Sequence, residues 1–235
     1  MIKSSATLEM VKIVARGLGD LKDRVVFLGG AATSLLITDP ALPHIRTTFD
    51  VDVIVEVLSR MDYYRLEEAL QERGFTQRID SDHPVWRWSF QKVIVDVMPT
   101  DETILGFSNR WYAQTIKNAG VVSIDVDLDI RLVTAPFFLA TKVEAFAGRG
   151  GGDFLSSHDI EDIISIINGR KELVGEVKRS CRELRNSLSE IFQALLADEA
   201  FLGSIPGHLL PDSANQARYE IVLERITQIA DLSRP

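Results

Sequence analysis

The stretch FLGGAATSLLITDPALPHIRTTFDVDVIVEV, Phe27 to Val57, holds a glycine pair, a run of small residues, and two aspartates one residue apart in an apolar segment. Residues i and i+2 of a β-strand project from the same face. Asp50 and Asp52 should therefore point together, with their Cα atoms about 6 to 7 Å apart. Like charges this close repel each other, so the pair needs a compensating positive charge, most simply a divalent cation. The stretch thus predicts a metal-holding strand.

A third carboxylate follows in the apolar segment KVIVDVMP, where Asp96 is the lone charge between Val93 and Pro99. A buried carboxylate is costly unless it is paired or bound to a metal ion. Carboxylate oxygens are the ligands that Mg²⁺ and Mn²⁺ prefer. Three of them on adjacent strands can bridge two metal ions about 3.5 to 4 Å apart, an arrangement used in phosphoryl chemistry. We therefore predict Mg²⁺ or Mn²⁺ at Asp50, Asp52 and Asp96.

The glycine pair suits the same chemistry. Gly29 and Gly30 stand at an expected strand-to-helix turn, where backbone N–H groups can approach a triphosphate and the helix N-terminus adds a favourable dipole. Thr33 and Ser34 follow with hydroxyl groups. Each feature alone has a common structural explanation, a solvated strand edge or a simple turn. Their combination in this order is specific.

Together these motifs resemble the nucleotidyltransferase superfamily with the polymerase-β-like fold, and within it the AbiEii-type nucleotidyltransferase toxins. In that family a glycine turn precedes an Arg-x-Thr-x-Asp-x-Asp strand, matched here by Arg46, Thr48, Asp50 and Asp52. The resemblance covers roughly residues 25 to 168. Its downstream positions are matched by Lys142, Arg149, Asp159 and Asp162.

The resemblance implies roles for these residues. Asp50 and Asp52 would hold the metal ion that carries the nucleotide, and Asp96 would help to hold a second one or act as general base. Lys142 would stabilise charge on a phosphate, although a lysine on an apolar helix can simply reach the surface.

Other matched positions leave two interpretations open. Arg46 and Thr48 would either orient phosphates or brace the start of the strand. Asp159 and Asp162 share one helix face, and structural support for Lys142 or Arg149 is the favoured interpretation for them.

Composition limits the class of protein. The 235 residues are 46% apolar, which is ample for a core, and the net charge of −8 argues against nonspecific coating of nucleic acid. The sequence has no apolar run of the roughly 18 to 20 residues that a membrane span needs. It also lacks the pattern of a signal peptide. The lone Cys181 fits a reducing compartment. We expect a cytoplasmic protein without membrane contact.

The order of apolar patterns predicts a mixed α/β (α+β) fold. Strand-like and helical patterns alternate first, and helical patterns follow from Pro136 onward. We expect a mixed-sheet nucleotidyltransferase domain at 1–133 and a helical domain at 134–235. The segment SIDVDLDIRL, with Asp125, Asp127 and Asp129, is interpreted as a strand with one solvated acidic face.

Three functions remain as hypotheses. The first is a metal-dependent enzyme that transfers NMP from an NTP such as ATP to tRNA, a protein or a small molecule and releases pyrophosphate. If it is a toxin, as the family suggests, it would have an antitoxin partner. The second is an inactive nucleotide-binding or protein-interaction module, because Ala135 and His158 depart from the family pattern. The third is an enzyme acting on an antibiotic-like acceptor.

Overall fold

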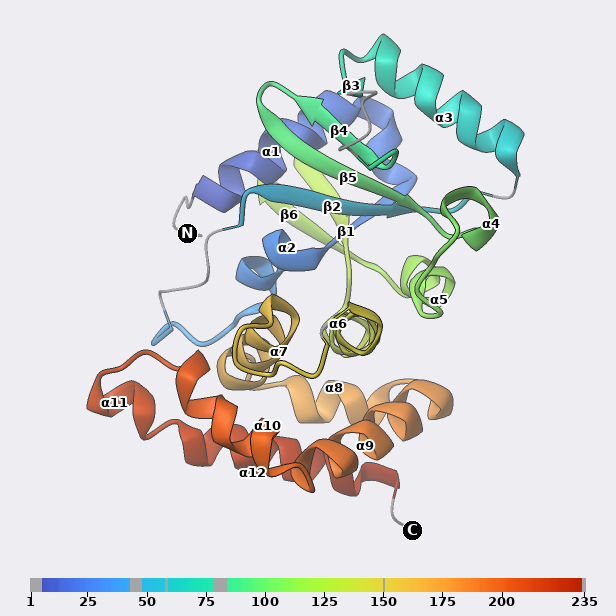
Figure 1. The fold of residues 1–235 in the computed structure, drawn as a ribbon. Coiled ribbons are helices and arrows are strands. Elements are labelled where there is room, and N and C mark those ends of the chain that lie inside the picture. Colours follow the sequence, from blue (N-terminus) through green and yellow to red (C-terminus); the bar gives the residue numbers. More distant parts are fainter. Residues whose placement is uncertain (1–5, 43–47, 58, 78–83, 150, 234–235) are drawn as a thin grey trace. The chain divides into compact units, whose positions relative to one another are not determined.

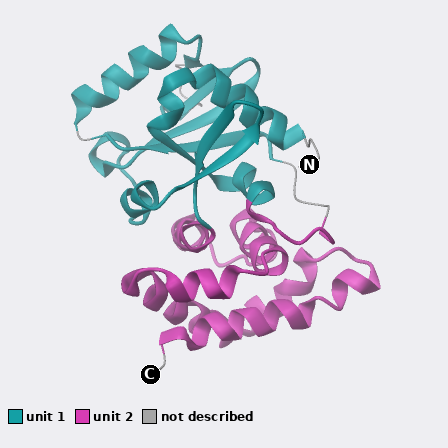
Figure 2. Ribbon diagram, turned by 180° about the vertical axis from the view of Figure 1, so that it is seen from behind, with its two compact units in different colours: residues 1–35, 46–134 teal, residues 36–45, 135–235 magenta. Residues whose placement is uncertain are grey.

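The computed structural model describes residues 6–42, 48–57, 59–77, 84–149 and 151–233. The chain forms two compact units (Figure 2). The first comprises Met1–Leu35 and Arg46–Thr134, and the second Leu36–Ile45 and Ala135–Pro235. A mixed sheet followed by helices confirms the predicted fold class. None of the described helices combines the length and the apolar character that crossing a membrane requires.

The first unit is built on a seven-stranded sheet with the order β3-β4-β5-β2-β1-β7-β6 (Figure 1). The pairs β2–β5 and β1–β7 are parallel and the other neighbours are antiparallel. Parallel neighbours need a crossover, so strands far apart in sequence become adjacent. The strands are β1 (Val25–Leu28), β2 (Asp50–Val55), β3 (Thr76–Gln77), β4 (Arg87–Phe90), β5 (Val93–Pro99), β6 (Gly120–Asp125) and β7 (Leu128–Leu132).

The two faces of this sheet differ in chemistry. A Cβ on Gly17 would lie 2.4 Å from the Phe90 ring, so helix α1 (Ala6–Leu18) packs against the face that carries Phe90 and Trp88. Trp88 pairs with Val95 across β4 and β5, and both are buried. Because side chains alternate along a strand, Arg87 projects from the opposite face. We call this opposite face, which also carries the predicted aspartates, the carboxylate face.

Short helices complete the first unit. Helix α3 begins after Ser59, whose hydroxyl accepts from the Asp62 amide at 3.2 Å, and Gly74 follows its end with a φ of +84°. Gly74 thus stops the helix in a left-handed conformation that glycine adopts without strain. The helices after α1 are the 3₁₀ turn η1 (Gly19–Asp23), α2 (Gly29–Leu36), α3 (Arg60–Glu72), α4 (Glu102–Leu105) and α5 (Tyr112–Lys117).

The acidic segment between residues 120 and 132 is a hairpin. Strands β6 and β7 pair antiparallel, and Asp127 has a φ of +59° in the turn between them. Asp125 accepts from Arg16 at 2.6 Å and lies 3.3 Å from Lys12. The segment SIDVDLDIRL is thus two strands joined by a turn that aspartate tolerates and not one strand, while Asp127 and Asp129 are solvent-exposed as interpreted.

The second unit is helical. Its core includes Phe192, Phe201 and Ile226, which are fully buried on three different helices. Amphipathic helices of this kind bury one apolar stripe each. The elements are α6 (Ala135–Arg149), α7 (His158–Gly169), α8 (Leu173–Arg179), α9 (Arg182–Leu196), α10 (Glu199–Ser204), η2 (Ile205–His208), α11 (Ser213–Gln216), α12 (Tyr219–Ala230) and η3 (Asp231–Ser233).

The segment 36–45 belongs to the second unit, whereas the pattern of the sequence predicted one domain over all of 1–133. The amides of Thr38 and Asp39 donate to the Gly169 carbonyl at 3.0 and 2.9 Å. Arg218 donates to Asp39 at 2.9 Å, and Asp39 is 7% exposed. A charge-assisted bond to a buried carboxylate and two bonds at a helix C-terminus hold this segment on the helical unit.

Candidate functional site

The two aspartates of β2 lie as the strand period predicts. Asp50 and Asp52 are half-buried on the carboxylate face, while Val51 and Val53 are fully buried on the other face. Partial exposure leaves carboxylate oxygens accessible without full burial of either charge. This combination suits ligands for a small cation.

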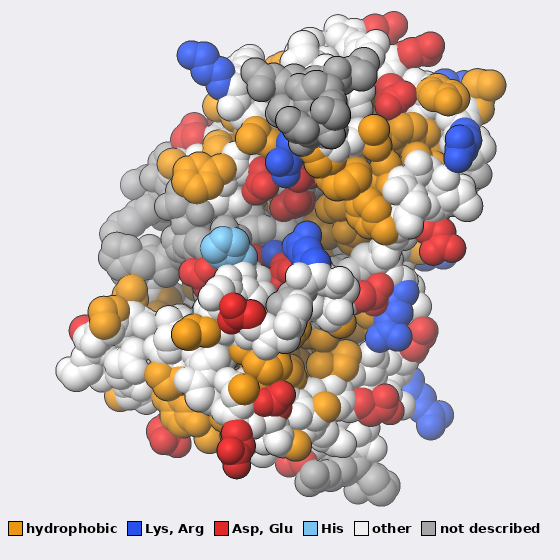
Figure 3. Space-filling model, viewed as in Figure 1, with side chains coloured by type: hydrophobic (Ala, Val, Ile, Leu, Met, Phe, Trp, Pro, Cys, Tyr) orange, Lys and Arg blue, Asp and Glu red, His pale blue; other side chains and the backbone are white. Residues whose placement is uncertain are grey.

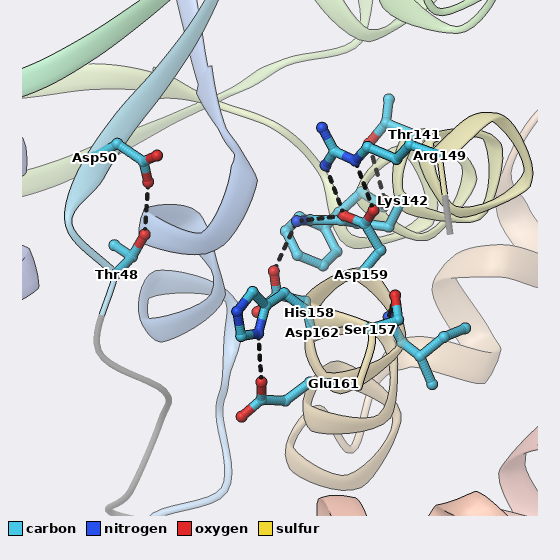
Figure 4. Close-up of polar contacts among 12 residues, drawn as sticks. Thr48, Asp50, Thr141, Lys142, Arg149, Ser157, His158, Asp159, Glu161 and Asp162 are labelled. Carbon is cyan, nitrogen blue, oxygen red and sulfur yellow. Dashed lines mark hydrogen bonds and ion pairs between the residues drawn. The ribbon is translucent and has the colours of Figure 1, made fainter. Parts of the chain in front are cut away.

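Thr48 lies just before β2 and contacts Asp50. Its hydroxyl is buried and donates to Asp50 Oδ1 at 2.8 Å (Figure 4). Of the two roles expected for Thr48, this contact matches the bracing of the strand start. Arg46, for which the same two roles were expected, lies outside the described residues.

Asp96 lies directly beside Asp52. Strands β2 and β5 are parallel with Asp52 opposite Asp96, so both side chains project from the carboxylate face. On its other side Asp96 faces Arg87 across the antiparallel β4–β5 pair. Asp96 is 6% exposed, and its two oxygens accept from Arg87 Nε at 2.8 Å and Nη2 at 2.7 Å. Arg87 and Asp96 thus form a bidentate ion pair.

The same guanidinium reaches Asp50, whose Oδ2 lies 3.8 Å from Arg87 Nη2. The hydrogen bond to Asp96 raises the pKa of Arg87, and the charges of Asp96, Asp50 and Asp52 raise it further against the effect of burial. All three predicted carboxylates therefore act on one arginine. The sequence motifs did not single out Arg87, although VWRWSF and KVIVDVMP look like a hairpin pair, and the observed hairpin sets Arg87 opposite Asp96.

The predicted three-carboxylate metal site is incomplete as the side chains stand. Within the described residues, no three or more His, Cys, Asp and Glu side chains form a group that could hold a metal ion. The Asp50 and Asp52 oxygens fit a divalent cation by chemistry and by facing the same way. Asp96 would fit it only after Arg87 releases one or both of its oxygens.

The position of the Asp52 side chain requires a glycine at residue 29. Gly29 has a φ of +70°, and a Cβ built there would lie 1.8 Å from Asp52 Oδ2. Leu28 pairs with Asp52 across the antiparallel β1–β2 ladder, which brings the next residue under the carboxylate. The glycine turn and the Asp-x-Asp strand are thus one packed unit.

The remaining residues of the predicted glycine turn lie in helix α2. Gly30 and Thr33 are buried, and Thr33 has no exposed surface. The Ser34 hydroxyl donates to the Ala31 carbonyl at 3.3 Å, inside the helix. Contact of these hydroxyls with a phosphate remains a prediction, and in the described conformation neither of them points freely into solvent.

Replacing Gly29 with alanine should destabilise the protein by about 2 to 4 kcal/mol, because the Cβ would meet Asp52 at a backbone angle that disfavours side chains. Gly106 is a matched control: its φ is +80° and a Cβ there would meet nothing within 4 Å. Gly106→Ala should cost only about 1 kcal/mol. Urea unfolding of both variants measures the difference, and equal losses would show that the contact with Asp52 is unimportant.

A second group of predicted residues lies in the helical unit. Lys142 of α6 is 9% exposed, and its Nζ lies 3.1 Å from Asp159 Oδ1 and 2.7 Å from Asp162 Oδ2 of α7 (Figure 4). Arg149 donates to both oxygens of Asp159 at 3.1 and 3.0 Å. These contacts match the favoured interpretation of the two aspartates, structural support for Lys142 or Arg149, which stays a prediction.

Electrostatics in this buried group favour the ionised form of Asp159. Burial alone would raise the pKa of Asp159, but hydrogen bonds and charge from Arg149 and Lys142 hold it below its ordinary value. Asp159 and Asp162 lie in the first turns of α7, whose N-terminus is capped by Ser157. Carboxylates there also complement the helix dipole. Lys142 is thus a buried cation between two helices.

The outer surface offers no large area of a single charge on the face drawn in Figure 3, where Lys and Arg side chains lie among Asp and Glu. A strongly basic track for a nucleic-acid backbone is not visible on that face.

Comparison with known proteins gives only distant likenesses. No protein-family model matches the chain. No curated protein matches it either. Among solved structures, JHP933 from Helicobacter pylori aligns over 97% of this chain and 92% of that chain, with 12% identity and a TM-score of 0.47. Another H. pylori protein, named provisionally as a nucleotidyltransferase, aligns over 97% and 95%, with 11% identity and a TM-score of 0.47. Both TM-scores lie below 0.5, so the function proposed below rests on this chain's own residues.

Proposed function

We propose that the chain is a metal-dependent nucleotidyltransferase, which transfers NMP from an NTP to an acceptor and releases pyrophosphate. The observation that carries the proposal is the placement of Asp50 and Asp52 on one face of β2, beside Asp96 of β5, directly against the Gly29 turn. Carboxylates aligned in this way on neighbouring strands suit chemistry on a polyphosphate.

In the proposed reaction, an acceptor oxygen forms a bond to the α-phosphorus of the NTP. The bond from that phosphorus to the bridging oxygen of pyrophosphate breaks, and the acceptor proton passes to a base. Asp50 and Asp52 would hold Mg²⁺ or Mn²⁺, which when bound offsets the negative charge of the triphosphate. Asp96 would serve as a further ligand or as the base, in either case after Arg87 has released it.

The identity of the acceptor is also part of the proposal. A tRNA, a protein or a small molecule would each supply a suitable hydroxyl or phosphate, and a toxin role would add an antitoxin partner. A second function is an inactive module that binds nucleotide without catalysis. It is favoured by one specific contact, the two hydrogen bonds of 2.7 and 2.8 Å from Arg87 to Asp96.

The test is transfer of label from each of the four α-³²P NTPs, with Mg²⁺ or Mn²⁺, to tRNA, to lysate proteins and to small aminated acceptors. We expect a labelled acceptor with at least one NTP and none when EDTA removes the metal ion. Calorimetry with the same NTPs separates the alternatives. Binding without transfer would support the inactive module, and failure to bind both NTP and metal ion would contradict both functions.

A further inference from the structure

The side chain of Arg87 lies among the carboxylates of the carboxylate face. It lies between Asp96, which it binds with two hydrogen bonds, and Asp50, which is 3.8 Å from its Nη2. The Asp96 side chain is 9% exposed and the Arg87 side chain 34% exposed. Such a partly desolvated bidentate pair is stronger and more directional than a surface salt bridge.

The charges around it explain why it is there. Asp50, Asp52 and Asp96 share one face of two adjacent strands, and their mutual repulsion needs a compensating cation. Arg87 supplies one positive charge from a third strand, in the cross-strand position opposite Asp96. The protein therefore brings its own cation to the carboxylates that the proposed function assigns to a metal ion.

A divalent ion and this guanidinium compete for the same oxygens. A carboxylate offers about four lone-pair sites, and a bidentate arginine takes one on each oxygen. A small cation binds oxygen at about 2.0 to 2.1 Å, which would bring two charges of the same sign close together at Asp96. The metal ion and the guanidinium would repel each other strongly there, because the Coulomb energy of two charges rises as the inverse of the distance between them.

We propose that Arg87 is an internal cation that competes with the divalent metal ion for Asp96, and that its guanidinium must leave Asp96 before all three carboxylates can bind metal. This inference rests on the proposed function. Asp50 and Asp52 are the carboxylates that would hold the first ion. Asp96 joins only when Arg87 moves, so Arg87 sets the affinity for metal.

The test measures Mn²⁺ binding without nucleotide, from the electron paramagnetic resonance signal of free Mn²⁺. Arg87→Gln should bind Mn²⁺ about tenfold more tightly than the native protein, because a like charge beside the site is removed. Arg87→Lys keeps the charge but loses the two-point contact, so its affinity should lie between the two. Arg65→Gln is the matched control, because Arg65 is 72% exposed and pairs with Asp62. It should leave the affinity unchanged.

Two further variants locate the effect. Asp50→Asn/Asp52→Asn should abolish tight Mn²⁺ binding, and Arg87→Gln/Asp96→Asn should lose the gain seen in Arg87→Gln. Circular dichroism checks that each variant is folded, and Mn²⁺ should raise the melting temperature of Arg87→Gln more than that of the native protein.

The outcomes separate the inference from the proposed function. If the native protein binds Mn²⁺ through Asp50 and Asp52 but Arg87→Gln binds equally or more weakly, the inference is overturned and the proposed function stands. A gain that persists without the Asp96 carboxylate also overturns it. If none of the proteins binds Mn²⁺, both fail.

Discussion

The double variant Asp50→Asn/Asp52→Asn is expected to lower the rate of nucleotidyl transfer by about 10³-fold or more. Without the two carboxylates the metal ion is not held, and its charge no longer supplies several kcal/mol of transition-state stabilisation. Asparagine keeps the size of each side chain and can still accept from Thr48 at position 50. Both aspartates are half-buried, so the neutral variants should fold. Rates at saturating Mg²⁺ and NTP, with a melting curve for each protein, measure the effect.

The chain contains its own control for this experiment. Asp127 and Asp129 form a second Asp-x-Asp sequence in the same unit, and both are exposed at the β6–β7 hairpin. Asp127→Asn/Asp129→Asn removes the same number of charges at the hairpin on the other edge of the sheet, separated from β2 by β1, so transfer should stay near the native rate. Equal losses in the two double variants, or activity of Asp50→Asn/Asp52→Asn within about tenfold of native, would contradict the proposed metal role.

Replacing Lys142 with methionine is expected to reduce the free energy of unfolding by about 3 to 5 kcal/mol, because it leaves two buried carboxylates without their shared cation. Asp159 and Asp162 are 5% and 1% exposed. Arg149 compensates only in part, since its side chain is 71% exposed and solvent weakens its pull. Urea unfolding at pH 7 measures the loss.

Two comparisons sharpen that result. Lys178→Met changes an exposed lysine on α8 and should cost less than about 0.5 kcal/mol. Adding Asp159→Asn and Asp162→Asn to Lys142→Met should recover part of the loss, because the unpaired charges go as well. If Lys142→Met unfolds like the native protein, the ion group is not a structural support. The catalytic role suggested by resemblance would then be the stronger interpretation of Lys142.

Much of the local structure could be predicted from the sequence. Asp50 and Asp52 share a face because the strand repeats every two residues, and α3 ends before Gly74 because a left-handed residue stops a helix. The helical character after Pro136 also follows from the apolar period. These features depend on neighbours within a few positions, which a single sequence displays.

Contacts between distant residues could not be predicted in the same way. The acidic segment 120–132 shows one alternating pattern, and only a left-handed Asp127 reveals that it turns back on itself. The placement of segment 36–45 on the helical unit depends on hydrogen bonds to Gly169 and Arg218, more than 100 residues away. Composition and period carry no information on such partners.

The sequence by itself determined that Asp50 and Asp52 project from the same strand face and that Asp96 needs a partner. The alternation of side chains along a strand and the cost of burying a charge depend only on the residue and its near neighbours. The two-residue turn at Gln91 and Lys92 fixes the register of β4 on β5 locally, and this register sets Arg87 opposite Asp96. Only the tertiary structure decided which distant segments join this pair. The register of β2 on β5 sets Asp52 beside Asp96, and the register of β1 on β2 brings Gly29 under Asp52. These strands are far apart in sequence, so their registers depend on the packing of the whole sheet.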